Sequence, residues 1–378
     1  MPAEYDIAVV GAGLVGLATA RELLRRHPDA RLAVLDKEPE IARHQSGHNS
    51  GVIHSGLYYA AGSLKAQLCR EGRAALLAYA EEKEIPHRLV GKLVVAVDES
   101  ELPRLEELRR RGEANGLEGL RELDDWHELE PHVAGVRALH VPETGVIDYR
   151  AVARAYAEDV RAAGGELLLG REVRAAEEVP AERVVVCAGL QADRLAPHAP
   201  HRVVPFRGDY FVLAPRAAEL VRGNVYPVPD PQFPFLGVHF TRRIDGEVWA
   251  GPNAVPSLAR EGYGRFRIDL RDARETLSSP GLWRLARRYW RMGALEILRD
   301  LVKPAAVREM RRYLPALRDE DVRFGPCGIR AQLLARDGSL VDDFLLEHDG
   351  DALHVLNAPS PAATASLAIA RRIADELD

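Results

Sequence analysis

The stretch YDIAVVGAGLVGLATARELLRR, residues 5–26, decides the fold of the first part of the chain. Its opening apolar residues are rich in β-formers, which is typical of a buried parallel strand. Gly11, Gly13 and Gly16 follow in the spacing G-x-G-x-x-G, and an amphipathic run continues to about residue 26. The pattern predicts a strand, a tight glycine turn and a helix.

These glycines have the positions that a dinucleotide site requires. Gly11 allows the turn, Gly13 lets the backbone approach a pyrophosphate, and Gly16 lets helix and strand pack closely. The helix N-terminus offers unpaired N–H groups to phosphates. RLAVLD, residues 31–36, predicts a second strand that ends at Asp36, whose carboxylate suits a ribose hydroxyl. The ordered series favours dinucleotide binding over an ordinary βαβ turn, but it does not separate FAD from NAD.

Length and composition narrow the class of protein. With 378 residues, 47% of them hydrophobic and 29% charged, the chain is globular and large enough for two lobes. Its net charge of −6, without a charged tail, argues against a nucleic-acid partner. The longest uncharged stretch, residues 7–20, is too short to span a bilayer and follows acidic residues, unlike a signal peptide. Three well-separated cysteines predict no disulfide framework, so we expect a cytoplasmic protein.

HQSGHNSGVIHSGLYYAAGSLKAQLC, residues 44–69, is dense in small residues and hydroxyl groups, as suits backbone that lies against a flat ligand. It also contains His44, His48 and His54. No carboxylate or cysteine stands among these histidines, and their spacing is not that of a metal motif, so we expect no metal.

Nine short motifs occur in an order typical of one family. They are GAGLVG (11–16), LDKE (35–38), HNSGVIHSG (48–56), PFRGDYF (205–211), YPVPDP (226–231), FLGVHFT (235–241), GPNAV (251–255), GIRAQ (328–332) and NAPSPAAT (357–364). With them the chain resembles, over nearly its whole length, the FAD-dependent L-2-hydroxyglutarate dehydrogenases or oxidases. These belong to the superfamily of D-amino-acid oxidase and glycerol-3-phosphate dehydrogenase. The link RAAEEVPAER, residues 174–183, is shorter than the family's usual hairpin.

The resemblance implies an α/β fold with two interleaved domains. A Rossmann-like FAD-binding domain comprises residues 1–85, 142–204 and 325–378, and an α+β substrate-binding domain comprises residues 86–141 and 205–324. The residues agree, because alternating strands with an Asp-Gly turn at 245–246 follow residue 201 and predict a mixed or antiparallel sheet. Helices are expected at about 63–84, 149–163 and 272–313.

The resemblance also implies where FAD lies. Ser360 and Pro361 predict a capped helix start, and in the family this N-terminus points at the flavin. Val173 lies where the family places backbone beside adenine. The full set of expected FAD contacts is Gly11, Gly13, Leu14, Val15, Gly16, Asp36, Lys37, His44, Ser46, His48, Asn49, Ser50, Gly51, Val52, Val173, Ala188, Gly189, Gly328, Arg330, Ser360, Pro361 and Ala362.

The implied reaction is oxidation of L-2-hydroxyglutarate to 2-oxoglutarate, with hydride transfer from C2 to flavin N5. Arg330, in GIRAQ, matches the family's arginine beside the flavin, and its planar fork suits the C1 carboxylate. His54, in VIHSG, is the expected base, and His239 is expected to bind substrate or share the proton transfer.

Four further residues are weaker candidates for substrate binding. Arg207 is a second carboxylate partner or instead positions a loop. Tyr226 and Asn253 are candidate donors to the substrate, and Tyr59 is a candidate for the distal carboxylate. A structural role is at least as well supported for each.

The chain has no second G-x-G-x-x-G, so electrons are expected to pass to a quinone or another acceptor rather than through a bound nicotinamide. Residues 280–302 combine Trp283 and Trp290 with several arginines, which suits peripheral membrane contact. We favour the simpler interpretation, in which the tryptophans pack inside.

Three alternatives stay open at this point. An FAD enzyme of the same fold oxidises another small substrate, such as an amino acid, another 2-hydroxy acid or glycerol 3-phosphate. A nicotinamide-dependent reductase and a non-catalytic nucleotide sensor are the others, although the histidines and the arginine in family motifs argue against a sensor.

Overall fold

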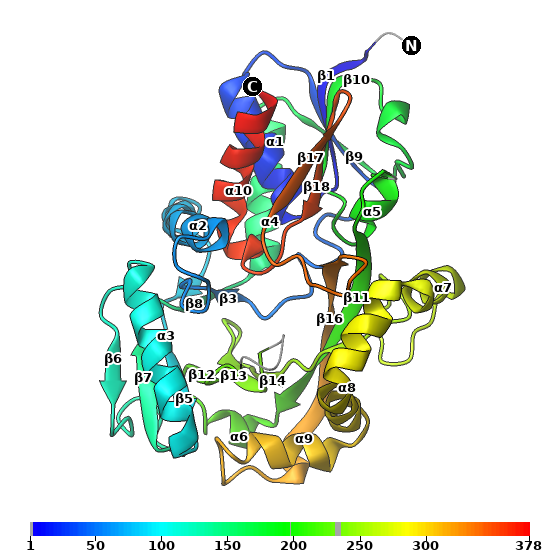
Figure 1. Cartoon of the computed structure of the whole chain (residues 1–378). Coiled ribbons are helices and arrows are strands. Elements are labelled where there is room, and N and C mark those ends of the chain that lie inside the picture. The colour runs from blue at the N-terminus through cyan, green and yellow to red at the C-terminus, as the bar shows by residue number, and fades with distance from the viewer. Residues whose placement is uncertain (1–2, 197, 231–235) are drawn as a thin grey trace.

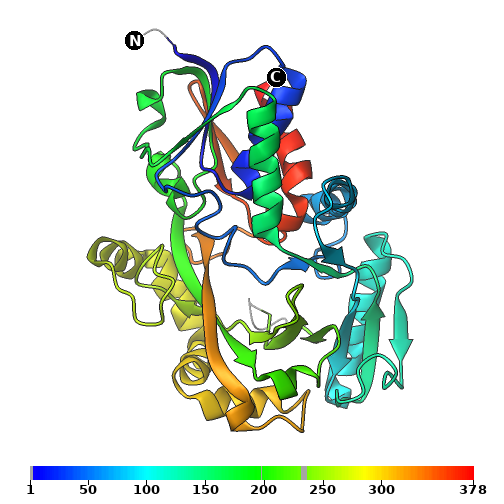
Figure 2. The same cartoon turned by 180° about the vertical axis from the view of Figure 1, so that it is seen from behind.

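The computed structural model describes residues 3–196, 198–230 and 236–378. The chain forms two bodies, one above the other in Figure 1, and each is built on its own large sheet. Two long antiparallel strands run between the bodies, as both views show (Figures 1 and 2). They are β11 (Arg202–Leu213) and β16 (Val322–Leu334).

The upper body contains a sheet of six strands within the described residues. Neighbouring strands are parallel except at one edge, where β17 and β18 are antiparallel. In order across the sheet they are β17 (Leu345–Asp349), β18 (Ala352–Asn357), β10 (Ala181–Val186), β1 (Tyr5–Val10), β2 (Leu32–Asp36) and β9 (Glu166–Leu169). The expected Rossmann-like βαβ start is confirmed.

Both faces of this sheet are covered, which explains why its strands are apolar without interruption. Ile7 and Val9 face one hydrophobic cluster, and Ala8 and Val10 face another. The first cluster also contains residues of the helices that pack on that face, which are α1 (Leu14–Arg26), α2 (Leu64–Glu82), α4 (Tyr149–Ala162) and α10 (Ala362–Leu377).

The lower body contains a mixed sheet with nine strands in the described chain. The pairing of β5 with β12 is parallel, and its other pairings are antiparallel. Its path is β15 (Val255–Pro256), β11, β14 (Val248–Gly251), β13 (His239–Arg242), β12 (Asn224–Pro227), β5 (Lys92–Ala96), β7 (Arg137–Val141) and β6 (Arg121–Leu123), with β16 beside β11. The expected mixed sheet is confirmed.

Helices flank this second sheet. One hydrophobic cluster joins its strands to the helix at 102–114, and another joins them to the helices at 215–218 and 303–310. The remaining elements are α3 (Leu102–Ala114), α5 (Ala192–Leu195), α6 (Pro215–Ala218), α7 (Leu270–Ser278), α8 (Pro280–Leu301), α9 (Lys303–Met310) and a small sheet of β3 (Val52–Ile53), β8 (Gly145–Ile147) and β4 (His87–Arg88). The predicted helices at 63–84, 149–163 and 272–313 are present, and Gly246, with φ +90°, forms the expected turn.

The domain boundaries expected from the sequence stay a proposal, which the two sheets support. The six-stranded sheet draws its strands from residues 1–85, 142–204 and 325–378. The nine-stranded sheet draws most of its strands from residues 86–141 and 205–324, and β11 and β16 cross the proposed boundaries.

One predicted helix start is wrong by one residue. Helix α10 begins at Ala362, so Pro361 is the cap position and no side chain caps the helix. The first helical hydrogen bond goes from Ala365 N to the Pro361 carbonyl. Ser360 lies one residue too early to cap the helix and is exposed. Ala362 N donates to the Pro359 carbonyl at 2.9 Å, so backbone carbonyls of the two preceding prolines, rather than a side chain, accept hydrogen bonds from the first turn.

The simpler interpretation of residues 280–302 is also wrong. Trp283 and Trp290 are 58% and 63% exposed on the outside of α8. The helix packs inward through leucines near its start and through Glu296 and Asp300 near its end, because those acids meet buried polar partners. No helix in the described residues is long and apolar enough to cross a membrane.

Candidate active site

A cavity of about 1010 Å³ opens between the two bodies. One end is lined by the β1–α1 turn and by β2, and we call it the cofactor end. The other end is lined by side chains from the nine-stranded sheet and from residues 54–59, and we call it the substrate end.

At the cofactor end, two glycines make a close backbone approach possible. Gly11 has φ +112°, a conformation that favours glycine, and a Cβ there would overlap the Cys187 carbonyl. A Cβ at Gly16 would overlap the Gly11 carbonyl. At Gly13 the nearest atom to such a Cβ is Ser46 Oγ, at 3.0 Å, so that glycine leaves room on the cavity side.

Polar groups fasten this turn to its neighbours. Asp36 accepts hydrogen bonds from Ala12 N at 2.7 Å and from Glu38 N at 2.9 Å. Ser46 Oγ accepts from Leu14 N at 2.9 Å, so the 44–52 segment lies directly against the helix N-terminus. The arrangement leaves an anion-binding helix end open to the cavity.

His44 lies within a group of charges that the sequence did not suggest. Its Nε2 is 3.1 Å from Glu38 Oε1 and 3.7 Å from Glu261 Oε1, so two carboxylates do approach this histidine. Lys37 Nζ binds both carboxylates, at 2.8 and 2.6 Å. Because the ammonium supplies the positive charge between them, the group is an ion-pair network.

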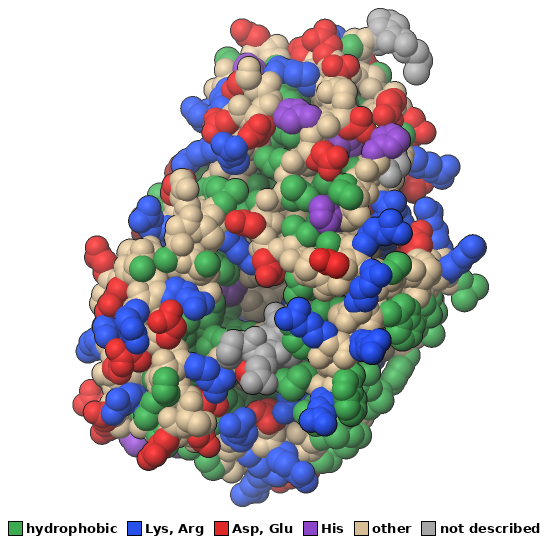
Figure 3. Space-filling view, viewed as in Figure 1, with side chains coloured by type: hydrophobic (Ala, Val, Ile, Leu, Met, Phe, Trp, Pro, Cys, Tyr) green, Lys and Arg blue, Asp and Glu red, His purple; other side chains and the backbone are tan. Residues whose placement is uncertain are grey.

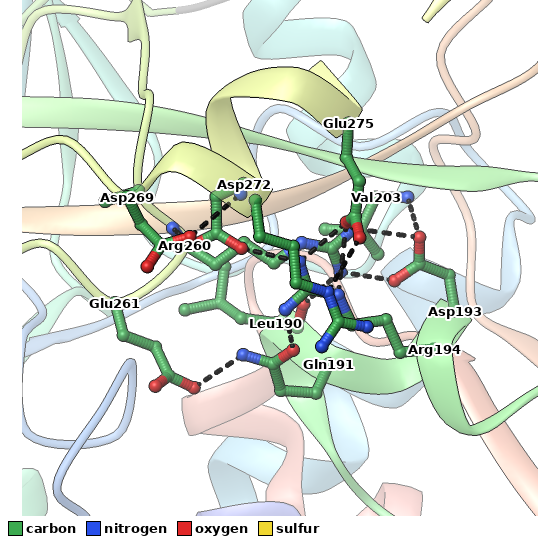
Figure 4. A network of polar contacts seen from close by, with 12 residues as sticks. Leu190, Gln191, Asp193, Arg194, Val203, Arg260, Glu261, Asp269, Asp272 and Glu275 are labelled. Carbon is green, nitrogen blue, oxygen red and sulfur yellow. Dashed lines mark hydrogen bonds and ion pairs between the residues drawn. The ribbon is translucent and has the colours of Figure 1, made fainter. Parts of the chain in front are cut away.

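Residues 257–268 pack beside this end of the cavity, and Glu261 of this segment lines it. The Tyr263 ring stacks on His48 with ring centres 3.8 Å apart. Figure 4 shows the polar network that holds this segment against residues 189–195. Arg260 Nη1 donates to the Leu190 carbonyl at 2.7 Å, and Gln191 Nε2 donates to Glu261 at 2.8 Å.

All but one of the residues expected to contact FAD line the cavity. The exception is Gly51, which is a turn residue with φ +75° whose carbonyl accepts from Ile147 N. The expectation for Gly51 is therefore corrected. The others line the wall at Gly11, Gly13, Leu14, Val15, Gly16, Asp36, Lys37, His44, Ser46, His48, Asn49, Ser50, Val52, Val173, Ala188, Gly189, Gly328, Arg330, Ser360, Pro361 and Ala362.

At the substrate end, Arg330 of β16 lines the cavity. Its Nη1 donates to the Asn253 carbonyl at 3.4 Å, and burial lowers the pKa of the guanidinium. A partly desolvated guanidinium in a cavity wall is a strong site for a carboxylate, since low local dielectric strengthens the pairing.

His54 and His239 both line the same end. Burial, together with the nearby Lys92 charge, lowers the pKa of His54 to about 3 and that of His239 to about 4. Both imidazoles are therefore neutral near pH 7. Nδ1 of His239 lies 3.0 Å from the Gly237 carbonyl, so it carries the proton and Nε2 is the ring's acceptor.

Tyr59 and Tyr226 line the cavity as expected. The Tyr226 ring stacks on His239 with centres 4.1 Å apart, which holds the imidazole in place. Phe235, the first residue of the FLGVHFT motif, lies outside the described residues.

Two predicted substrate ligands are corrected. Arg207 does not line the cavity, because it is buried in ion pairs with Asp209 at 2.8 Å and Asp300 at 2.9 Å. The Asn253 side chain donates to Asp300 at 2.8 Å and accepts from Asp209 N at 2.7 Å. Asn253 therefore supports Arg330 through its backbone carbonyl instead of facing the substrate.

Sequence reasoning missed several side chains at this site. Tyr58 and Tyr210 line the substrate end, and Tyr263 stacks on His48 behind the wall of the cofactor end. Lys92 lies behind Tyr58, with its ammonium 4.4 Å from the ring centre. A lysine at the start of an apolar strand gives no functional signal, and neither does a tyrosine within a loop.

Comparison with known proteins defines the class. The family model for FAD dependent oxidoreductases matches residues 6–376. Among solved structures, the L-α-glycerophosphate oxidase of Mycoplasma pneumoniae has a TM-score of 0.77 at 23% identity and covers 99% of this chain and 94% of its own. The glycine oxidase of Geobacillus kaustophilus has a TM-score of 0.71 at 21% identity, covering 99% and 94%. The chain belongs to the FAD-dependent oxidoreductase family.

Curated relatives narrow the class. A mitochondrial L-2-hydroxyglutarate dehydrogenase of Nematostella vectensis is 48% identical over 414 residues, covering 99% of this chain and 91% of the relative. The human mitochondrial counterpart is 44% identical, with 99% and 89% covered, and that of Indibacter alkaliphilus is 44% identical, with 97% of each covered. Within its family, the chain therefore belongs with the L-2-hydroxyglutarate dehydrogenases.

FAD is the cofactor of this family, and the residues present fit it. The glycine turn lines the cavity without side chains at Gly11, Gly13 and Gly16, as close approach of a pyrophosphate requires, and the cavity extends from there to the histidines. The start of α10 faces the same cavity, so its positive end can stabilise negative charge on the cofactor.

Proposed function

We propose that the protein oxidises L-2-hydroxyglutarate to 2-oxoglutarate at the substrate end of the cavity. The observation that carries the proposal is the position of one arginine and two neutral histidines in the wall of a cavity that begins at a dinucleotide cradle. Bound FAD supplies the acceptor for the two electrons and the hydrogen that leave C2.

Arg330 binds the C1 carboxylate of the substrate. Its guanidinium donates from Nη1 to the Asn253 carbonyl at 3.4 Å, which helps to orient the group. A charge-assisted, bidentate pair fixes the orientation of C2 as well as its position, which is what transfer to a planar acceptor requires.

His54 takes the proton from the C2 hydroxyl, and His239 orients that hydroxyl or shares the proton. Both rings are neutral, as a base must be. His239 also presents a defined acceptor, Nε2, because Nδ1 is held by the Gly237 carbonyl. Replacing each histidine by glutamine decides between them, since loss of the base slows flavin reduction far more than loss of the orienting partner.

The test of the proposal is anaerobic mixing of the purified holoprotein with each enantiomer of 2-hydroxyglutarate while the flavin spectrum is followed. Fast bleaching by the L-enantiomer alone is expected. Faster bleaching by an amino acid, another 2-hydroxy acid or glycerol 3-phosphate would overturn the assignment of substrate in favour of that compound.

Electrons leave to a quinone or a similar acceptor, and the outer face of α8 is the proposed site of peripheral membrane contact. Trp283 and Trp290 are exposed there beside Ile297 and Leu301, with Arg288 and Arg291 close by. Hydrophobic side chains gather at the lower right of Figure 3, on the side where α7 and α8 lie. Aromatic and basic residues on one exposed face suit an anionic bilayer surface.

Sedimentation with anionic vesicles at low salt checks this contact. The protein should pellet with vesicles that contain phosphatidylglycerol, and the double variant Trp283→Ser/Trp290→Ser should stay in the supernatant with flavin reduction unchanged. Failure of the unaltered protein to pellet would contradict the contact without affecting the substrate.

A further inference from the structure

Two buried acids on the inner side of α8 have no part in the chemistry described so far. Glu296 and Asp300 are 6% and 4% exposed, and because they lie four residues apart they face the same side of the helix. A buried carboxylate is costly unless it is paired and hydrogen-bonded. Both acids find hydrogen-bond donors in the loop that joins β14 to β15, next to Arg330.

Glu296 binds the peptide group that also contacts Arg330. Ala254 N donates to Glu296 Oε2 at 3.2 Å, and the Asn253 carbonyl accepts from Arg330 Nη1 at 3.4 Å. This N–H and this C=O belong to one peptide unit, which is planar and trans, so they point to opposite sides. By holding the N–H, Glu296 therefore also sets the direction of the carbonyl that contacts the guanidinium.

The rest of Asn253 is held as well. Its side chain donates to Asp300 Oδ1 at 2.8 Å and accepts from Asp209 N at 2.7 Å. A Cβ at Gly208 would lie 3.0 Å from the Asn253 carbonyl oxygen, so the missing side chain leaves room for this carbonyl. The carbonyl beside Arg330 therefore has its position set from several sides.

Glu296 also acts on Arg330 through its charge. Burial lowers the pKa of Arg330, and the negative charge of Glu296 opposes this shift, so the acid lies close enough to influence the guanidinium. The acid is itself held in an ion-pair network, because Arg299 Nη1 lies 3.0 Å from Glu296 Oε1 and Arg299 Nη2 lies 2.9 Å from Glu309 Oε2. Glu296 does not line the cavity, so any effect on the substrate passes through Arg330.

We propose that Glu296 is a positioning residue, which directs the guanidinium of Arg330 through the peptide group between Asn253 and Ala254. This inference rests on the proposed function, which places the C1 carboxylate at Arg330. Coulombic attraction of the carboxylate depends mainly on distance, whereas hydrogen transfer from C2 needs close alignment. Loss of the hydrogen bond from Ala254 N should therefore slow flavin reduction more than it weakens substrate binding.

Two conservative variants separate the hydrogen bond from the charge. Glu296→Asp keeps the charge, but its side chain is one methylene shorter and withdraws from Ala254 N. Glu296→Gln keeps the length and an acceptor oxygen but loses the charge. Anaerobic stopped-flow absorbance with L-2-hydroxyglutarate gives the limiting rate of flavin reduction per bound FAD and the apparent Kd. The limiting rate should fall about tenfold in Glu296→Asp and stay within about threefold in Glu296→Gln, with Kd changed no more than about threefold in either.

Arg299→Met is the matched control. It removes the ion pairs with Glu296 and Glu309 but leaves the hydrogen bond from Ala254 N, so Tm should fall while the limiting rate per FAD is unchanged. Titration of the flavin spectrum with 2-oxoglutarate measures binding without turnover. All three variants should bind this product within about threefold of the unaltered protein, since the charge of Arg330 is retained.

A limiting rate in Glu296→Asp equal to that of the unaltered protein would overturn the proposal. An equal or larger loss in Glu296→Gln would overturn it as well, because the charge and not the hydrogen bond would then control the rate. A loss confined to Kd would show that Glu296 acts on affinity instead of orientation. If Glu296→Asp fails to fold, Glu296→Met, which keeps the length but has no acceptor oxygen, takes its place in the comparison with Glu296→Gln.

Failure of the unaltered protein to reduce its flavin with L-2-hydroxyglutarate is a different result, which contradicts the proposed function itself. The same variants are then compared with the α-carboxylate substrate that does reduce the flavin. A slower Glu296→Asp beside an unaffected Glu296→Gln would still support the positioning role, and the reverse order would contradict it.

Discussion

The cofactor end of the cavity is lined largely by residues from a few continuous stretches, whereas the substrate end is lined by side chains that separate strands bring together. At the first end, Gly11 and Gly16 lie five residues apart and permit contacts that any Cβ would block. At the second, Arg330 comes from β16, His239 from β13 and Tyr226 from β12. A local sequence motif is enough to define the cofactor end, but only the assembled sheet defines the substrate end.

Two arginines within the long β11–β16 pair make the same point. Arg207 lies opposite Ile329, and the next register position joins Phe206 to Arg330. Because successive side chains point to opposite faces of a sheet, the two guanidinium groups diverge. One meets buried aspartates and the other lines the cavity. Both residues are arginines, so the groups that surround each guanidinium decide whether it forms a buried ion pair or lines the cavity.

The largest effect is expected where the substrate end loses its cation. Arg330→Met should reduce the rate of flavin reduction at low L-2-hydroxyglutarate by about a thousandfold, because a charge-assisted bidentate pair is lost. Stopped-flow absorbance of the flavin under anaerobic conditions measures this rate. FAD content should stay unchanged, and a rate within a few-fold of the unaltered protein would show that another group holds the C1 carboxylate.

Replacing the other arginine should affect stability instead. Arg207→Met leaves Asp209 buried without its cation and Asp300 with only Arg265, at 3.5 Å, and should lower the free energy of unfolding by about 3 kcal/mol. Urea unfolding of both proteins at pH 7 measures this difference in the free energy of unfolding. Burial and the hydrogen bond to Asp300 already raise the pKa of Asp209. An acid whose folded-state pKa is raised gains stability as pH falls, so the loss should shrink below pH 7.

A glycine substitution examines the cofactor end. Gly13→Ala should weaken FAD binding at least about tenfold, because the new methyl group occupies the approach to the pyrophosphate, while the nearest protein atom is Ser46 Oγ at 3.0 Å. Thermal unfolding of the apoprotein should be unchanged. Gly16→Ala, which overlaps the Gly11 carbonyl, should instead destabilise the apoprotein. Equal FAD affinity in Gly13→Ala and the unaltered protein would argue against this mode of approach.

The smallest effect concerns pH. Burial and nearby cations lower the pKa of His54 to about 3 and that of His239 to about 4, so the neutral base persists above these values. As the pH is lowered, kcat/KM should therefore not fall with a midpoint near 6.5, the usual pKa of an imidazole. Replacing Lys92 with methionine removes a positive charge that lowers the pKa of both histidines. The acidic midpoint of the kcat/KM profile should therefore move to higher pH. A midpoint near 6.5 in the unaltered protein would place the base outside this buried pair.

The prediction from sequence succeeded where function depends on local backbone. The glycine turn, the acid at the end of β2 and the small-residue segment are contiguous patterns, and all form the cofactor end. It left two roles open for Arg207 and Asn253, and the structure favours the structural role for both, because each side chain binds Asp300 of α8, which is far away in the chain. Likewise α8 carries Glu296 and Asp300 on its buried side and both tryptophans outside, the reverse of what apolar periodicity indicates.

The sequence by itself determined the dinucleotide cradle and the family, and it singled out Arg330, His54 and His239 as candidates that prove to line the cavity, because those features are carried by short motifs. The tertiary structure decided which cations reach the cavity and which are neutralised inside the protein. It also showed that Lys92 is buried without a described counter-ion and that the face of α8 is exposed. The physical reason is that charge pairing and burial depend on neighbours brought together by strand pairing, and chain order does not encode those neighbours locally.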